Sequence, residues 1–171
     1  MATHDKMKGS EFREFFIDEL KDIYWAEQHL AKALPKLEEA STSKQLSAAF
    51  QKHTKETEQQ IKMVEQVFEM MGEKPEAKKC KAMEGLLKEA DDIISDTEKD
   101  SYTRDAGLIL AGQKVEHYEI ATYGTLRILA GHMGEEKIKK VLSEILENEK
   151  ETDVALTKVA ENYINERASS E

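Results

Sequence analysis

Four segments of this chain carry an apolar stripe at helical spacing, and acidic side chains interrupt each stripe near its middle. The apolar residues recur every three or four positions, so each stripe lies on one face of a helix. Charged groups on a core-facing stripe are rare, because burying a charge is costly unless it is paired or bound to a metal. Four interruptions at similar depth therefore predict acidic side chains that converge inside a helical bundle. The interrupting residues are Glu27, His53, Glu56, Glu116, Glu119, Glu149 and Asp153.

The composition supports an all-α fold. The 171 residues are 35% charged and 39% hydrophobic, and only two are proline. This mixture is typical of long amphipathic helices, and the β-branched runs that mark strands are absent. We expect five helices, over about residues 11–40, 43–71, 76–96, 101–130 and 135–167. Pro35 lies inside the first of them and should kink it or end it early.

The connections between these helices predict their arrangement. The first and second helices are joined by a few residues, as are the fourth and fifth, so each pair should form an antiparallel hairpin. About 30 residues, including the short helix at 76–96, lie between the two pairs. Two hairpins joined by one long crossover are typical of a ferritin-like four-helix bundle. We therefore expect one bundle domain at 11–167, a flexible segment at 1–10 and a frayed tail at 168–171.

Charge and hydropathy exclude several classes of partner. The formal net charge is −10, which argues against nucleic-acid binding because phosphates require a basic surface. No apolar stretch is long enough to cross a membrane, and the N-terminal residues lack the apolar region of a secretory signal. With one cysteine, Cys80, the chain cannot form an internal disulfide. We therefore expect a cytoplasmic protein.

The seven interrupting residues form a candidate metal site. Six are carboxylates, and burying all six in ionised form is untenable without compensating charge. Two divalent ions would supply four positive charges and two trivalent ions six. Iron prefers such an oxygen-rich set with some imidazole, and manganese is the alternative. We expect two ions, with Glu56 and Glu149 as bridging ligands. The expected roles of the others are terminal ligation by Glu27 and Glu116, completion of the shells by Glu119 and Asp153, and nitrogen donation by His53.

Two observations keep other interpretations open. Dinuclear carboxylate bundles carry a Glu-x-x-His motif on two helices, whereas this chain has none and offers the reversed His53-x-x-Glu56. Any single Glu on a stripe is also more often a rim residue whose stem lies along the core. Tyr24 and Tyr123, near the same level, are either packing groups or hydrogen-bond partners of a ligand.

Several segments resemble the YciE/YciF family of ferritin-like bacterial proteins. The most specific is Val115-Glu116-His117-Tyr118-Glu119-Ile120-Ala121, and the resemblance covers about residues 11–165. The other matching segments are Phe15–Lys36, Ala49-Phe50-x-x-His53-x-x-Glu56-Thr57, Cys80-x-Ala82-Met83-x-Gly85-Leu86, Tyr123-Gly124-Thr125-Leu126 and Glu149-x-x-x-Asp153. The resemblance implies a ferritin-like bundle, a homodimer and an association with bacterial stress responses. It places the candidate metal site on the same seven residues and implies no settled reaction.

Two functions follow as hypotheses. The first is a dinuclear iron or manganese protein that acts on peroxide, oxygen or ferrous iron during stress. The second is a non-catalytic structural or interaction protein that has kept the bundle without redox activity. The missing Glu-x-x-His motifs favour the second, and the coincidence of acidic side chains on four helices favours the first.

Overall fold

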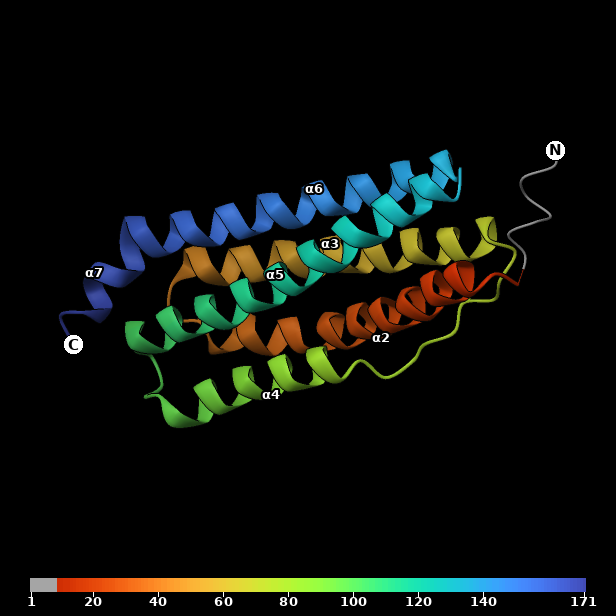
Figure 1. Ribbon diagram of the computed structural model, residues 1–171. Helices are drawn as coiled ribbons and strands as arrows, with labels where there is room; N and C mark the ends of the chain where they lie inside the picture. Colours follow the sequence, from red (N-terminus) through yellow and green to blue (C-terminus); the bar gives the residue numbers. More distant parts are fainter. Residues whose placement is uncertain (1–8) are drawn as a thin grey trace.

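The computed structural model describes residues 9–171, and every regular element in that range is helical. Four long helices run side by side and a shorter helix, α4, lies outside them (Figure 1). The elements are α2 (Glu11–Ala40), α3 (Lys44–Met70), α4 (Lys81–Asp96), α5 (Tyr102–His132), α6 (Glu136–Val159), the π-helical segment η1 (Ala160–Ile164) and α7 (Asn165–Ala168). None of these helices is long and apolar enough to span a membrane. The all-α prediction is confirmed, while the flexible segment expected at 1–10 lies mostly outside the described residues.

The first hairpin joins α2 and α3 through a short turn. Ser43 caps α3 by accepting from the backbone N–H groups of Gln45 and Leu46. Asp105, at the start of α5, accepts from the backbone N–H groups of Thr42 and Ser43, each at 2.7 Å. The turn of the first hairpin is thereby tied to the second. Pro35 does not end α2 early, because the helix continues to Ala40.

The second hairpin joins α5 and α6, and its turn contains Gly134 at φ +76°, a conformation that favours glycine. A single helix was expected over 135–167, but the structure interrupts it with η1. Beyond α7 the Glu171 carboxylate accepts from the backbone N–H groups of Tyr102 and Thr103, the first residues of α5. Fraying of 168–171 in solution stays a prediction.

The crossover differs from expectation at its start. A helix was expected from residue 76, but residues 73–80 are extended and α4 begins at Lys81. The extended segment follows α2, where Lys78 N–H donates to the Lys21 carbonyl (Figure 1). The Cys80 sulfur then caps α4 by accepting from the Met83 N–H. The stretch must span the bundle after α3 ends, so fewer residues remain for the helix.

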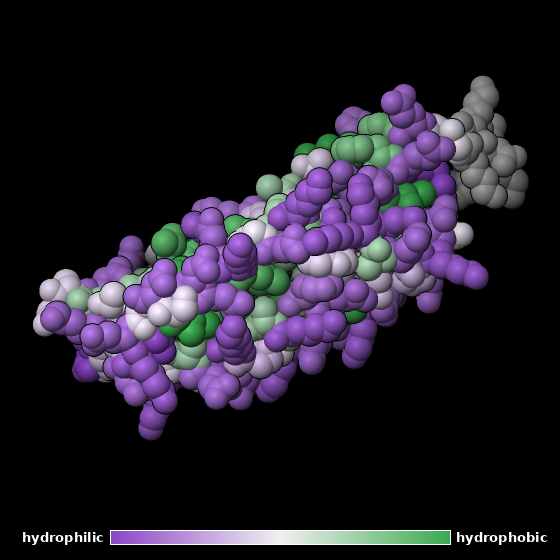
Figure 2. All heavy atoms as spheres, turned by 90° about the horizontal axis from the view of Figure 1, so that it is seen from below, coloured by the Kyte–Doolittle hydropathy of each residue, from purple (hydrophilic) through white to green (hydrophobic). Residues whose placement is uncertain are grey.

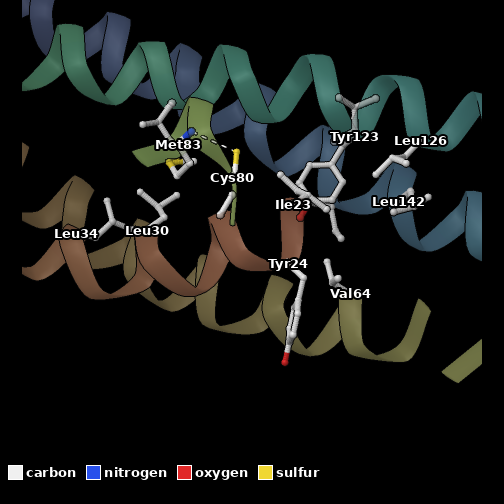
Figure 3. Close-up of a cluster of buried hydrophobic side chains, with 14 of the residues drawn as sticks. Ile23, Tyr24, Leu30, Leu34, Val64, Cys80, Met83, Tyr123, Leu126 and Leu142 are labelled. Carbon is white, nitrogen blue, oxygen red and sulfur yellow. Dashed lines mark hydrogen bonds between the residues drawn. The ribbon is translucent and has the colours of Figure 1, made fainter. Parts of the chain in front are cut away.

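The core runs along the bundle between the four long helices. We call each cross-section of the core along the bundle axis a level, and buried apolar side chains fill most levels. Figure 3 shows one such cluster, to which α2, α3, α5 and α6 each contribute. Hydrophilic side chains dominate the face drawn in Figure 2, with small apolar patches between them. The two hairpins therefore enclose one continuous core, and the candidate site is a strongly polar level within it.

Candidate metal centre

Four of the seven predicted ligands meet in the core. His53 on α3, Glu116 and Glu119 on α5, and Glu149 on α6 each offer a ligand atom, and these atoms lie within 4.8 Å of one another. All four side chains are buried. Because the four come from both hairpins, the centre depends on the assembled bundle.

Glu27 supplies the contribution of α2. Its side chain is fully buried, and its charge interacts with that of Glu149. Tyr123 donates a short hydrogen bond to Glu27 Oε1, which leaves Oε2 unpaired. In Figure 3, Tyr123 reaches from α5 towards α2, while Tyr24 points away from the cluster. Tyr24 instead donates to Glu65 at 2.8 Å, so only Tyr123 takes the partner role considered for both.

These five residues hold most of the unpaired polar atoms of the core. Among the described residues, twelve buried side-chain nitrogen or oxygen atoms have no hydrogen-bond partner. Nine of them belong to the centre: Glu27, His53, Glu116, Glu119 and Glu149. His53 Nδ1 and Glu116 Oε1 lie 3.2 Å apart without hydrogen-bond geometry. Because native proteins leave few buried polar groups unpaired, a concentration at one level points to a missing partner.

Burial also shifts the protonation of the centre. It raises the pKa of Glu149 to about 7. Burial, followed by repulsion from Glu149, raises the pKa of the other carboxyl groups well above 4.5, which holds for Glu27, Glu116 and Glu119. Burial lowers the pKa of His53 to about 4, so its imidazole is neutral at pH 7. In the metal-free centre, burial therefore favours protonated carboxyl groups. His53 is neutral, so one of its ring nitrogens can bind a metal.

Glu56 lies nearer the surface than the buried cluster. Its side chain is 20% exposed and accepts from Lys52 Nζ at 2.6 Å. Asn148 Nδ2 donates to the same oxygen at 3.1 Å. The bridging role predicted for Glu56 therefore requires its side chain to leave these partners.

Asp153 occupies a similar position beside α5. Its side chain is 22% exposed and lies 3.3 Å from Nε2 of the exposed His117. Gln113 Nε2 donates to Asp153 Oδ1 at 3.1 Å. Asp153 and Glu56 thus flank the buried cluster, and their metal-ligand roles stay predictions.

The buried donor set fits a pair of metal ions. Four fully ionised carboxylates carry four negative charges, which two divalent ions would neutralise. Carboxylate oxygens with one imidazole nitrogen suit iron or manganese, whereas structural zinc sites are typically richer in cysteine and histidine. The five residues Glu27, His53, Glu116, Glu119 and Glu149 would hold the ions, and their unpaired atoms would become ligand atoms.

Two amide side chains beside the centre were not assigned a role from the sequence. Gln60 Nε2 donates to Asn148 Oδ1 at 2.7 Å, and buried Gln60 Oε1 has no partner among the described residues. Gln60 also lies close to the Glu149 carboxylate and lowers the pKa of that group against the effect of burial. Gln60 lies on the interrupted stripe and Asn148 precedes Glu149, so sequence position was the available signal.

Comparison with known proteins agrees with this fold. Residues 11–169 match the family DUF892, described as a domain of unknown function. Protein YciF of Escherichia coli strain K12 is 47% identical over 165 residues, which cover 96% of this chain and 99% of that protein. The crystal structure of the E. coli stress protein YciF matches with a TM-score of 0.87 and 48% identity, covering 91% of this chain and 98% of that chain.

Two further solved structures are similar. YcfI from Rhodopseudomonas palustris, named as a candidate structural protein, matches with a TM-score of 0.85 and 39% identity over 88% of this chain and 96% of that chain. A protein from Xanthomonas campestris pv. campestris shares the fold, with a TM-score of 0.73 and 20% identity over 94% of this chain and 98% of that chain. Because the family match spans nearly the whole chain and YciF is 47% identical to it, this protein belongs to the DUF892 family, the family of YciF that its sequence motifs resemble.

Proposed function

We propose that this protein binds two iron or manganese ions at the polar level of its core and acts on peroxide, oxygen or ferrous iron during stress. The observation that carries the proposal is the group of nine unpaired buried atoms on five ionisable residues. An apolar core of the same size would avoid the cost of burying them. Their retention at one level is accounted for if metal ions complete the site.

The residues of the chain would prepare the site in distinct ways. His53 offers a neutral nitrogen at pH 7, because burial lowers its pKa to about 4. The carboxyl groups would release protons as they become ligands, so metal binding should be tighter at higher pH. Tyr123 orients Glu27 through its hydrogen bond. The surrounding apolar levels exclude bulk water, and the bound pair of ions would supply Lewis-acid and redox chemistry.

Reconstitution of metal-free protein tests this proposal. We expect binding of about two ions per chain when Fe²⁺ is added without oxygen, or when Mn²⁺ is added. Adding peroxide or oxygen to the iron-loaded protein should then oxidise the iron faster than it oxidises free Fe²⁺. Glu149→Gln should lose most of the binding, whereas Glu147→Gln, an exposed residue on the same helix, should keep it. Absence of binding by the unaltered protein would refute the proposal.

A non-catalytic structural role is the second candidate. Two observations favour it: the absent Glu-x-x-His motifs, and the similarity to YcfI, which is named as a candidate structural protein. This role predicts that Glu149→Gln leaves stress survival of a complemented deletion strain unchanged. Loss of survival with retained protein level would reject it in favour of the metal-dependent role.

The family resemblance also leads us to propose a homodimer located in the cytoplasm. Sedimentation velocity of the full chain tests the first part, with a dimer expected and a concentration-independent monomer contradicting it. Fractionation of the native host tests the second, with the chain expected among the cytoplasmic proteins.

A further inference from the structure

A hollow between α3 and α6 lies directly outside the metal centre. Its volume is about 440 Å³, and most of its lining residues are polar or charged, with Met63 and Ile145 as the apolar ones. The polar residues include Glu56, Gln60 and Asn148. None of the five residues of the centre lines the hollow, but Gln60 and Asn148 do, and both are neighbours of Glu149.

Four side chains that line this hollow are joined in series by hydrogen bonds. Lys52 donates to Glu56 at 2.6 Å, and Asn148 donates to the same Glu56 oxygen at 3.1 Å. Gln60 Nε2 donates to Asn148 Oδ1 at 2.7 Å, and the Gln60 amide lies close enough to the Glu149 carboxylate to lower its pKa. These hydrogen bonds thus lead from an exposed ammonium group to the buried Gln60 amide, which lies beside the buried Glu149 carboxylate.

One atom of this hydrogen-bonded series has no partner among the described residues. Gln60 Oε1 is buried and unpaired, although Gln60 lines the hollow. An amide oxygen is a hard ligand that suits a divalent ion in transit. By contrast, two other hollows, one against α2 and α5 and one on the outer face of α6, have no predicted ligand in their linings.

We infer that divalent cations reach the metal centre through this hollow, and that Glu56 receives them by exchanging the Lys52 ammonium for the incoming ion. The inference rests on the proposed function, because it concerns access to the same centre. Asn148 and Gln60 then offer amide oxygens on the way to Glu149. Glu56 is in this account a positioning residue for uptake, which differs from the resident bridging ligand expected from the sequence.

The Lys52–Glu56 pair is suited to such an exchange. The Lys52 side chain is 65% exposed, and ion pairs at that exposure contribute little to stability because water and salt screen them. A divalent ion attracts the Glu56 carboxylate more strongly than one ammonium does. Lys52 therefore balances the charge of Glu56 until an ion arrives, and the arriving ion can displace the Lys52 ammonium at little cost.

Uptake kinetics of Mn²⁺ by the metal-free full chain test this inference. Binding is followed by loss of the free-ion electron paramagnetic resonance signal, and release is followed after addition of a chelator. Glu56→Gln should slow both uptake and release about tenfold, while affinity and stoichiometry stay unchanged. Lys52→Gln should accelerate uptake, because it removes the competing cation. Glu147→Gln, which alters an exposed ion pair on α6, should match the unaltered protein.

Three results would overturn the inference. If Glu56→Gln lowers affinity with an unchanged uptake rate, Glu56 is a resident ligand. If Asp153→Asn slows uptake and release and Glu56→Gln does not, the ions pass on the α5 side. Unchanged kinetics in both Glu56 and Lys52 variants would also reject the route while the proposed metal centre stands. Absence of Mn²⁺ and Fe²⁺ binding by the unaltered protein would instead reject the centre itself.

Discussion

The core of this bundle contains two kinds of level that are equally buried and differently built. At the apolar level around Phe50, the side chains pack closely against Gly112. A Cβ added to Gly112 would lie 3.1 Å from Leu156 Cδ1 and 3.4 Å from Phe50 Cε1. At the polar level, Glu116 and Glu149 are just as inaccessible, yet their oxygens have no hydrogen-bond partner among the described residues. The first kind of level stabilises the fold. We expect the second to weaken the metal-free fold, a cost that the proposed binding of metal ions would offset.

The largest effect should come from emptying an apolar level. Phe50→Ala should lower the free energy of unfolding by about 3–5 kcal/mol, because it removes a fully buried ring and leaves a cavity. Chemical denaturation with a chelator present measures this loss. Phe15→Ala serves as the matched control: Phe15 is 50% exposed, so its replacement should cost far less. Equal losses in the two variants would contradict the account of the core.

Replacing a carboxyl group of the polar level with an apolar side chain should change the free energy of unfolding in the opposite direction. Glu119→Leu should raise the free energy of unfolding of metal-free protein by about 1–4 kcal/mol, because a buried unpaired carboxyl group is replaced by an apolar side chain of similar size. The same variant should lose the stabilisation that added metal gives the unaltered protein. Denaturation with and without Mn²⁺ checks both parts. A less stable metal-free variant would remove the contrast between the two levels.

The polar level should also make stability depend on pH. Carboxyl groups whose folded pKa is raised stabilise the fold at low pH, and that contribution is lost as pH rises through the folded pKa. This applies to Glu149, at about 7, and to the other three carboxyl groups, whose pKa burial raises well above 4.5: Glu27, Glu116 and Glu119. The lowered pKa of His53 instead makes stability rise with pH, but this rise is complete above pH 6.5.

Metal-free protein should therefore lose stability between pH 6.5 and 8. The loss is about 2 kcal/mol for each carboxyl group that stays protonated across this range in the fold. Denaturant titrations in a chelating buffer measure it, and excess Mn²⁺ should abolish the trend. Stability that rises with pH over this range would contradict the account of the polar level.

The smallest effect should come from the residue that orients Glu27. Tyr123→Phe removes the hydroxyl group that donates to Glu27 and keeps the ring in the core. Metal affinity should fall about tenfold, since partners of ligands typically contribute that much or more. Isothermal titration with Mn²⁺ measures the change, with Tyr24→Phe as a control because Tyr24 bonds Glu65. Equal affinities of the Tyr123 variant and the unaltered protein would mean that Glu27 needs no orientation.

Helical periodicity predicted the fold closely because helix ends carry local signals. The helix expected from residue 43 begins at Lys44 with Ser43 as its cap, and the α2 boundaries match the predicted 11–40. The start of α4 was wrong by five residues, since the length of extended chain needed to reach its position depends on the assembled bundle. The π-helical segment at 160–164 carries no recognisable sequence signal.

The same periodicity predicted which helices meet at the site better than it predicted how deeply each side chain is buried. On α3 the buried line passes through His53, Thr57 and Gln60, and Glu56 lies about 60° from His53 around the helix axis. That offset places Glu56 at the edge of the stripe. For Asp153 the wheel position resembles that of buried residues, and its partial exposure depends on how closely α5 approaches. Tertiary packing alone determines that distance.

The measurement that tests the central claim most directly is elemental analysis of protein purified without chelators from metal-replete cells. The account predicts iron or manganese approaching about two ions per chain. Anomalous scattering from crystals of that protein should then place the ions among His53, Glu116, Glu119 and Glu149. An empty bundle that also takes up neither Fe²⁺ nor Mn²⁺ on reconstitution would contradict the account.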